Sequence, residues 1–484
     1  MKLTELIKPW LNEPHLNCEI IGLSNDSRNI SPGFVFLAYP GADNDGRLFM
    51  RMAASKGVAA VIYEPKDCPP DCFPPAIACL PLPGLAKNLA LIASRFYGAP
   101  SAKITVTGVT GTNGKTTIAY QLAKAHSLLG QHAAYIGTLG QGNVDKLNEL
   151  NNTTPDPICL QTLLYHYQKN NIQQLIMEVS SHALVQNRVD AIDFNQAIFT
   201  NLSHEHLDYH QSMSAYAAAK ALLFSKETLT AVIVNTDDLY AKQMLAAIKQ
   251  QSCRIISYGQ QENALVRLLN WELSLTKTYF SISSPWGRHD LAINSLGMFN
   301  IFNTLAVFSS LMTYNYTIPQ ILAVIATLKS PPGRMEVVND APYIIVDYAH
   351  TPAALENALA TLALIKKNRI IVVFGCGGGR WQSKRPIMGK IAAAYADILI
   401  LTNDNPRSED PNVIINAIAA GIDNKAIIVY KIPDRQAAIL QAINLAKQDD
   451  TVLVAGKGHE TYQQIGQVRY SFSDQEIIRK QSSQ

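Results

Sequence analysis

Short apolar runs recur along the chain, separated by stretches in which apolar residues have helical spacing. In the first hundred residues, β-type runs at 34–37 and 59–63 mix with helical stretches, and the pattern predicts a helix over 85–96. Continuous apolar runs that alternate with helices are typical of parallel strands buried on both faces, whose ligands bind at the carboxyl ends of the strands. From residue 103 such runs are found at 104–107, 133–136, 174–177, 197–200 and 231–234.

The periodicity changes in the second half of the chain. Between Arg254 and Ile293 it becomes two, with Trp271, Leu273 and Leu275 alternating with polar residues, which predicts an antiparallel annex. A break at Lys329-Ser-Pro-Pro-Gly333 then precedes a second series of strand and helix patterns, which predicts a second, doubly wound α/β domain. Its apolar runs are 343–346, 370–374, 398–401, 426–430 and 452–455.

Length and charge narrow the class of protein. A chain of 484 residues exceeds a single typical core and suggests about three domains. The 41 basic and 38 acidic residues give a net charge of +3 without basic blocks, so no nucleic-acid partner is expected. No apolar run approaches the roughly 18 residues of a membrane span, and the N-terminus lacks a signal-peptide pattern. We therefore expect a cytoplasmic protein without a membrane partner, whose seven scattered cysteines are free thiols.

A glycine-rich turn follows the run at 104–107 and carries the clearest chemistry. In Gly108-Val-Thr-Gly-Thr-Asn-Gly-Lys-Thr-Thr117, backbone N–H groups and a helix N-terminus can surround phosphates, Lys115 can reach the β- and γ-phosphates, and Thr116 can hold Mg²⁺. The usual spacing would place a glycine at Val109, so we expect Gly108 and Gly111 to bracket a turn with one extra residue. The turn predicts an ATP or GTP site. Its residues are Gly111, Thr112, Asn113, Gly114, Lys115, Thr116 and Thr117.

Polar residues that follow neighbouring strands suggest a metal at the phosphates. Glu178 ends one buried run, and the histidine-rich segment Leu202–His210 follows another. Taken singly, these side chains could equally be helix caps or core histidines. Their position after strands that adjoin the phosphate loop favours a metal–phosphate site, where oxygen ligands from Thr116 and Glu178 suit Mg²⁺ and His206 would be a less usual ligand.

With these pieces in order, the chain resembles the Mur ligases, ATP-dependent amide ligases of peptidoglycan precursor synthesis. The resemblance covers essentially the whole chain. It implies a UDP-sugar-binding domain at 1–99, a central P-loop ATPase-like domain at 100–331 and a Rossmann-like amino-acid-binding domain at 332–484. The matching motifs are Gly111–Thr117, Asn152–Pro155, Glu178–Leu184, Asn201–His210, Gly297–Asn303, Pro332–Glu336 and Asp347–Pro352.

The resemblance also assigns site residues. It implies catalytic roles for Lys115, Glu178, His206 and Lys220, with Lys220 carrying CO₂ as a carbamate that joins Thr116, Glu178 and His206 around Mg²⁺. From the sequence alone, Lys220 is a solvated helix lysine. Further ATP contacts implied by the family are Asn300, Asn303, Arg334 and Asp347. The UDP-sugar peptide is expected at Asn25, Ser27, the Ala42–Asn44 loop, Asn152, Thr153, Thr154, Ser180, Gln186 and Arg188.

Within the family, the chain is most similar to the ligases that add the third residue of the stem peptide. The sequence Asp404-Asn-Pro-Arg407 implies that this residue is meso-diaminopimelate, since a guanidinium can pair bidentately with its second carboxylate. Without the resemblance, an Asn-Pro turn followed by an exposed arginine would be the simpler interpretation. The implied amino-acid site consists of Arg380, Asp404, Asn405, Pro406, Arg407, Gly456 and Glu460.

The sequence-based hypothesis is therefore a monomeric, ATP-dependent ligase that joins meso-diaminopimelate to the D-Glu γ-carboxylate of UDP-MurNAc-L-Ala-D-Glu. Close alternatives are a lysine-adding Mur ligase and a folylpolyglutamate synthetase, although the latter generally lacks an N-terminal domain like residues 1–100. An alternative of another class is a P-loop switch, which would hydrolyse ATP without an amino-acid acceptor.

Overall fold

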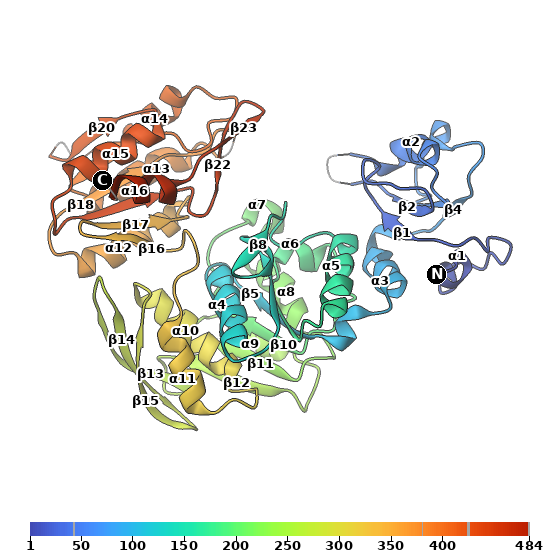
Figure 1. Cartoon of the computed structure of the whole chain (residues 1–484), viewed down its shortest axis with the longest axis horizontal. Helices are drawn as coiled ribbons and strands as arrows, with labels where there is room; N and C mark the ends of the chain where they lie inside the picture. Colours follow the sequence, from blue (N-terminus) through green and yellow to red (C-terminus); the bar gives the residue numbers. More distant parts are fainter. Residues whose placement is uncertain (42–43, 380, 424–425, 483–484) are drawn as a thin grey trace. The chain divides into compact units, whose positions relative to one another are not determined.

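The computed structural model describes residues 1–41, 44–379, 381–423 and 426–482. By the contacts between its residues, the chain divides into two compact units. Figure 1 shows the helices and strands of the whole chain. The first unit comprises Met1–Lys115 and His126–Ile256, and the second comprises Thr116–Ala125 and Ser257–Gln484. Three positions of the predicted site, Ala42, Asp43 and Arg380, lie outside the described residues.

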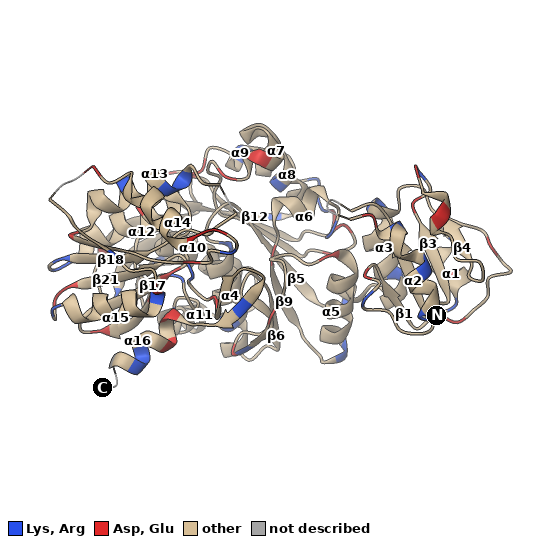
Figure 2. Cartoon of the chain, turned by 90° about the horizontal axis from the view of Figure 1, so that it is seen from above, with Lys and Arg blue, Asp and Glu red and all other residues tan. Residues whose placement is uncertain are grey.

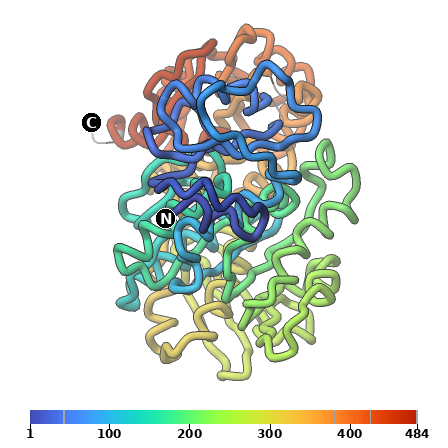
Figure 3. Tube along the Cα trace, turned by 90° about the vertical axis from the view of Figure 1, so that its right-hand side faces the viewer, coloured from blue at the N-terminus to red at the C-terminus, as the bar shows by residue number. Residues whose placement is uncertain are grey.

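The first unit begins with a small parallel sheet whose two faces are both covered. Val35 and Leu37 face a core formed with α1 (Leu3–Ile7) and α3 (Leu85–Tyr97), whereas the intervening Phe36 packs with α2 (Met50–Ser55) on the other face. The path of this segment is the blue trace in Figure 3. The strands, in sheet order, are β1 (Gly22–Ser24), β2 (Phe34–Ala38), β3 (Ala60–Tyr63) and β4 (Cys79–Pro81).

The larger sheet of the first unit has the strand order β11-β10-β5-β9-β6-β7-β8. Strands β11 to β6 in this order are parallel, as the sequence predicted, and β7 and β8 form an antiparallel edge. The strands are β5 (Thr105–Thr110), β6 (Ala133–Gly137), β7 (Gly140–Asn143), β8 (Lys146–Asn148), β9 (Gln174–Glu178), β10 (Gln196–Phe199) and β11 (Ala231–Asn235). The helices of this unit are α5 (Pro157–Lys169), α6 (Ser181–Val185), α7 (Leu207–His210), α8 (Met213–Phe224) and α9 (Ala241–Ala246). Helix α4 (Lys115–Leu128) is divided, since its residues Thr116–Ala125 belong to the second unit.

One prediction about the phosphate loop is wrong. Gly108 does not bracket the turn, because β5 continues to Thr110 and Gly108 pairs with Ala197 and Met177 of the neighbouring strands. A Cβ at Gly108 would approach the ring of Phe194 to 2.8 Å. This glycine is therefore explained by close packing inside the sheet, and the turn itself begins at Gly111.

The antiparallel annex in the second unit is present, with two corrections. Strand β12 (Arg254–Gly259) pairs in parallel with β13 (Val266–Leu273), and only β13, β14 (Thr278–Ser284) and β15 (Gly287–Ile293) are antiparallel. A register shift between Leu268 and Asn270 ends the expected alternation. Trp271 is consequently 46% exposed, and the predicted inward face is not continuous. Helices α10 (Met298–Leu311) and α11 (Ile318–Thr327) follow.

The rest of the second unit is the predicted doubly wound domain. Its sheet has the order β16-β17-β21-β18-β19-β20, with β16 as an antiparallel edge strand. Helices α12 (Pro352–Ile365), α13 (Lys384–Tyr395) and α14 (Pro411–Ala419) cover one face, and α15 (Arg435–Leu445) and α16 (Asp474–Ser482) cover the other. The strands are β16 (Glu336–Asp340), β17 (Tyr343–Asp347), β18 (Ile370–Phe374), β19 (Ile398–Leu401), β20 (Ile428–Lys431) and β21 (Thr451–Ala455); β22 (Tyr462–Ile465) and β23 (Val468–Ser471) form a separate hairpin.

No helix among the described residues combines the length and the apolar character that a membrane span requires. In Figure 2, Lys and Arg positions are interspersed with Asp and Glu positions in both units.

Packing of α13 against α14 gives a test of this fold. Gly389 is buried in α13, and a Cβ there would fall on the backbone carbonyl of Ile418. Gly389→Ala should therefore lower the free energy of unfolding by about 1 to 3 kcal/mol through overpacking, although alanine alone favours a helix by about 1 kcal/mol. Urea unfolding measures the change. The exposed neighbour Lys390→Ala is the control, and equal stability of both variants would contradict the packing.

Candidate functional site

The phosphate loop is held in shape by contacts within the protein. Gly111 has φ +148°, and a Cβ there would collide with the hydroxyl of Thr200, so only glycine fits. The Lys115 ammonium donates to the carbonyls of Gly111 (2.9 Å) and Thr112 (2.8 Å). The Thr112 N–H donates to the carbonyl of Asn201, which follows β10. A preformed turn at the start of α4 is the arrangement that binds phosphate groups.

Glu178, at the carboxyl end of β9, is completely buried, and both of its carboxylate oxygens accept hydrogen bonds. Its Oε1 accepts from the Tyr135 hydroxyl (2.5 Å) and the Thr138 N–H (2.8 Å), and its Oε2 accepts from the Thr138 hydroxyl (3.2 Å). The same Thr138 hydroxyl lies 3.1 Å from that of Thr153, one of the predicted substrate contacts. Tyr135 and Thr138 were not predicted from the sequence, since they are ordinary residues of β6 and the turn after it.

The structure overturns the view of Lys220 as a solvated helix lysine. The residue is 1% exposed, its Nζ donates to the carbonyl of Gly111 (2.8 Å), and it lies 4.5 Å from the centre of the Tyr216 ring. Burial lowers the pKa of the Lys220 amine well below its usual value, and the charge of Lys115 lowers it further. The neutral amine is thereby favoured, which is the form that can react with CO₂.

His206 belongs to a cluster of rings next to Lys220 in the first unit. Its ring centre lies 5.1 Å from that of His182 and 6.1 Å from that of Tyr216, while His210 stacks on Tyr216 at 4.9 Å. Burial lowers the pKa of all three histidines, so neutral imidazoles are favoured. His182 and His210 were not predicted as site residues. Among the residues that the structure describes, no group of three or more His, Cys, Asp or Glu side chains could hold a metal.

Four of the predicted UDP-sugar contacts form one network with Glu178. The Thr154 hydroxyl donates to the carbonyl of Glu178 (2.8 Å) and accepts from the Ser180 N–H (3.1 Å). Arg188 donates to the carbonyl of Thr154 (2.9 Å) and to the Gln186 side chain (2.9 Å). The network fixes an arginine whose charge suits a phosphate or a carboxylate.

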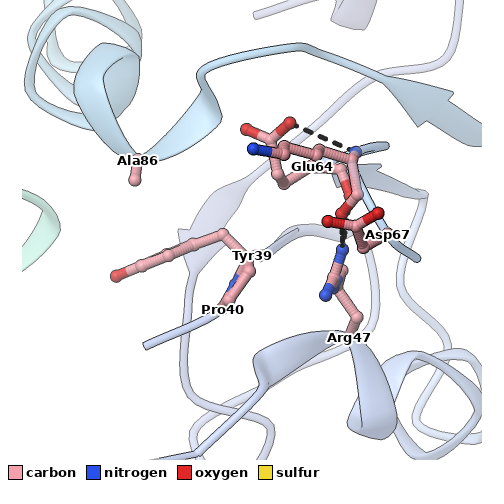
Figure 4. A pocket seen from close by; sticks show the side chains of 7 residues that line it. Tyr39, Pro40, Arg47, Glu64, Asp67 and Ala86 are labelled. Carbon is pink, nitrogen blue, oxygen red and sulfur yellow. Dashed lines mark hydrogen bonds between the residues drawn. The ribbon is translucent and has the colours of Figure 1, made fainter. Parts of the chain in front are cut away.

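The remaining predicted UDP-sugar residues are more dispersed. Asn25 donates to the hydroxyl of Tyr39 (3.2 Å), Ser27 is buried with its carbonyl bound by Lys56 (2.7 Å), and Asn152 is exposed. Tyr39 lines a pocket of about 500 Å³ in the N-terminal part of the first unit (Figure 4). Its lining residues are Tyr39, Pro40, Arg47, Glu64, Lys66, Asp67 and Ala86.

In the second unit, the predicted nucleotide residues lie on α10 and at the start of the C-terminal sheet. Asn303 donates to the side chain of Asn300 (2.9 Å), which confirms that the two share a helix face. Arg334 donates to the Thr116 hydroxyl (3.4 Å) and stacks over the Tyr348 ring at 4.7 Å.

Asp347, also predicted to contact ATP, is held by its own chain at the end of β17. Its carboxylate accepts from the backbone N–H groups of Met335 (2.7 Å) and Ala349 (2.8 Å). Burial raises the pKa of the Asp347 carboxyl, against these two donors and the charge of Arg334.

The predicted amino-acid residues lie together at the carboxyl edge of the C-terminal sheet. Gly456 has φ +113°, and a Cβ there would approach Oδ2 of Asp404 to 2.6 Å, so the loops after β19 and β21 touch. Asn405 donates to Glu460 (2.9 Å). Lys457, fully buried and not predicted, donates to Glu460 (2.9 Å) and Asn405 (3.2 Å). Lys457 lies within the Gly456–Glu460 segment, and the two site residues predicted in this segment could have indicated that Lys457 also belongs to the site.

Arg407 is fixed by backbone groups on both sides. It has φ +51°, and its N–H and carbonyl pair with Gln464 (3.1 Å) and Gly466 (2.8 Å) of the β22–β23 hairpin. Its guanidinium donates to the carbonyl of Gly378 (2.9 Å). The adjacent Pro406 is buried, and its carbonyl is so close to Gly378 that no Cβ would fit. The guanidinium therefore lies over the glycine loop that follows β18.

Three family models match this chain in order along the sequence. The "Mur ligase family, catalytic domain" matches residues 19–97, the "Mur ligase middle domain" matches 109–311, and the "Mur ligase, glutamate ligase domain" matches 333–458. A UDP-N-acetylmuramoyl-L-alanyl-D-glutamate--2,6-diaminopimelate ligase of Chromobacterium violaceum is 44% identical over 456 residues, covering 93% of this chain and 91% of that protein. The chain belongs to the Mur ligase family.

Further comparisons agree with this assignment. The equally named ligase of Coxiella burnetii is 42% identical over 95% of both chains. A solved structure of a ligase of this name has a TM-score of 0.73 at 33% identity, covering 99% of this chain and 98% of the other. The Thermotoga maritima MurF ligase in complex with ADP shares the fold at a TM-score of 0.64 and 18% identity, covering 90% and 93%. The predicted family and the three-domain α/β fold class are confirmed.

The phosphate loop of this Mur ligase gives a second prediction. Lys115→Met keeps the length of the side chain but removes its charge, so the affinity for Mg²⁺·ATP should fall roughly tenfold or more, as expected when a charged hydrogen bond is lost. Isothermal titration calorimetry with a non-hydrolysable ATP analogue measures this. The exposed Lys103→Met, outside the loop, is the matched control. Equal affinities for both variants would show that Lys115 does not contribute to nucleotide binding.

Proposed function

We propose that this Mur ligase joins meso-diaminopimelate to the γ-carboxylate of the D-Glu residue in UDP-MurNAc-L-Ala-D-Glu, at the expense of ATP. The observation that carries the proposal is the loop after β19, in which Arg407 is held over the glycine loop with Asp404, Asn405 and Glu460 beside it. A guanidinium and carboxylates in one site suit an amino acid that carries a second ammonium and a second carboxylate. The names of the curated relatives support the same substrate.

The reaction needs an activated carboxylate, because a carboxylate is a poor electrophile and oxide is a poor leaving group. We propose that the γ-phosphoryl group of ATP passes to a carboxylate oxygen of D-Glu, releasing ADP and forming an acyl phosphate. The amine of diaminopimelate then attacks the acyl carbon, loses a proton, and expels phosphate. Lys115 would neutralise charge on the phosphoryl oxygens during transfer.

Three domains would bind the three substrates. We propose the boundaries 1–99 for the UDP-sugar domain, 100–331 for the ATP domain and 332–484 for the amino-acid domain. The Arg188 network, which belongs to the central domain, would also bind the UDP-MurNAc-dipeptide, since its guanidinium is oriented by Gln186 and Thr154. We expect the enzyme to act as a monomer in the cytoplasm, where ATP is supplied.

The residues assigned to Mg²⁺ fit the ion only if Lys220 is modified. An ammonium close to a divalent cation is repelled, whereas a carbamate is an anionic oxygen ligand that joins the Glu178 carboxylate. The neutral amine favoured by burial at Lys220 is the form that makes a carbamate. Thr116, Glu178, His206 and carbamylated Lys220 would hold the ion, which supplies charge neutralisation at the phosphates when bound.

The first test of the function is phosphate release by the purified chain with ATP, Mg²⁺ and UDP-MurNAc-L-Ala-D-Glu. We expect release with meso-diaminopimelate and not with L-lysine, and a tripeptide product by mass spectrometry. Release with lysine instead would keep the ligase but replace the proposed amino acid. Release that needs no amino acid would favour a hydrolytic switch.

A matched pair of arginine variants strengthens this test. Arg407→Gln should reduce the preference for meso-diaminopimelate over lysine roughly ten- to hundredfold, because the charged partner of the second carboxylate is lost. Arg469→Gln, an exposed arginine on β23 of the neighbouring hairpin, should leave the preference unchanged. The ratio of kcat/KM values for the two amino acids is the measurement.

Carbamylation of Lys220 can be observed without turnover. In ¹³C-bicarbonate, the wild-type protein should show a carbamate carbon signal by NMR, because burial favours the neutral amine at this position. The signal should disappear in Lys220→Arg, which cannot form a carbamate, and persist in Lys226→Arg, a lysine that pairs with Asp190 at 3.1 Å. A wild-type spectrum without the signal would refute the modification.

A further inference from the structure

A fully buried arginine stands behind the amino-acid loops. Arg435 is the first residue of α15, and both it and Asp474, the first residue of α16, have no exposed side-chain surface. The Arg435 guanidinium binds the Asp474 carboxylate through two parallel hydrogen bonds, from Nε (2.8 Å) and from Nη2 (2.7 Å). A buried bidentate pair of this kind fixes the plane of the guanidinium.

Two further N–H groups of Arg435 bind backbone carbonyls. Nη1 donates to the carbonyl of Asn403 (3.2 Å), and Nη2 donates to the carbonyl of Ala455 (3.0 Å). These carbonyls belong to the peptide groups that lead directly into Asp404 and Gly456. A single planar group therefore holds the starting points of both loops of the proposed amino-acid site.

The two loops that begin at Asp404 and Gly456 lie so close together that neither can move far relative to the other. The carboxylate of Asp404 lies so close to Gly456 that a methyl group would approach it to 2.6 Å. Asn405 and Glu460, one from each loop, are joined by a hydrogen bond of 2.9 Å. A shift of one loop against the other would disturb both contacts.

We propose that Arg435, oriented by Asp474, is a positioning residue that sets the spacing of the two loops that bind the incoming amino acid. The inference rests on the proposed function for the nature of that amino acid. Arg435 touches no substrate, and it acts through the carbonyls of Asn403 and Ala455. A lysine could keep a charge next to Asp474, but its point-like ammonium cannot reproduce the planar fork that holds two carbonyls.

The chain offers a control pair in the same domain. Arg369 binds Asp450 with a similar fork, its Nη2 lying 2.6 Å from the carboxylate, and it also donates to the carbonyl of Leu445 (3.0 Å). Arg369 precedes β18 and Asp450 precedes β21, so this pair lies at the amino edge of the sheet. The Arg435 pair lies at the carboxyl edge, where the amino-acid loops begin.

The experiment compares Arg435→Lys with Arg369→Lys in the full chain, measuring melting temperature and the KM of each substrate. We expect both variants to melt at lower temperature than the wild type. Only Arg435→Lys should raise the KM for meso-diaminopimelate, by roughly tenfold or more. The KM values for ATP and for the UDP-linked dipeptide should stay unchanged in both variants.

The outcomes separate this inference from the proposed function. Equal KM values for meso-diaminopimelate in the two variants, or a uniform rise for all three substrates, would overturn the positioning role. A wild-type enzyme that uses a different amino acid would overturn the proposed substrate, and the KM comparison would then be made with that amino acid.

A second variant keeps the test decisive if Arg435→Lys does not fold. Asp474→Asn retains the guanidinium and its carbonyl contacts but removes the charge that orients it. This variant should raise the KM for the amino acid by a smaller factor, again without changing that for ATP. An unchanged KM for the amino acid in folded Asp474→Asn would overturn the role of the pair.

Discussion

Burial of both faces of the parallel sheets is the constraint on which the rest of the structure depends. Every residue of β9, β18 and β21 is buried, so these strands cannot present chemistry from their faces. Polar groups can meet a ligand only where the strands end, and all strands of a parallel set end at the same edge. Glu178, Asp347, Asp404 and Gly456 all stand at or just beyond a carboxyl end. Burial of the sheets thus restricts a ligand site to their carboxyl edges, whichever side chains are found there.

At these edges, cationic side chains are held by neutral backbone oxygens. Lys115 donates to the carbonyls of Gly111 and Thr112, and Arg407 donates to that of Gly378. A carbonyl orients a cation without cancelling its charge. Lys457 differs, since its ammonium is paired with Glu460. The sites therefore keep positive potential for phosphates and carboxylates, while one ammonium serves to fix a carboxylate in place.

The sequence predicted the parts of the structure that depend on local pattern. The strands, the doubly wound C-terminal domain and the turn before Lys115 follow from apolar runs and glycines, and the shared helix face of Asn300 and Asn303 follows from their spacing. Contacts made across the fold were not predictable. Nothing local shows that Lys220 is buried, or that Tyr135 reaches Glu178, which lies in a different strand. The annex was predicted only in outline, because a register shift within one strand leaves no mark on the sequence.

The Arg435–Asp474 pair is another contact across the fold that the sequence did not predict. Its hydrogen bonds explain why two charged side chains are buried at this position. Two buried ions cost more than an apolar pair of equal volume unless their hydrogen-bonding groups are used elsewhere. At the carboxyl edge, the chain leaves the regular hydrogen bonding of the sheet, so the part-buried carbonyl of Asn403, just beyond β19, and the buried carbonyl of Ala455, at the end of β21, need donors. An apolar residue would fill the space but leave both carbonyls unsatisfied. The ion pair is therefore best understood as the means by which two loops that bind polar ligands are attached to an apolar core.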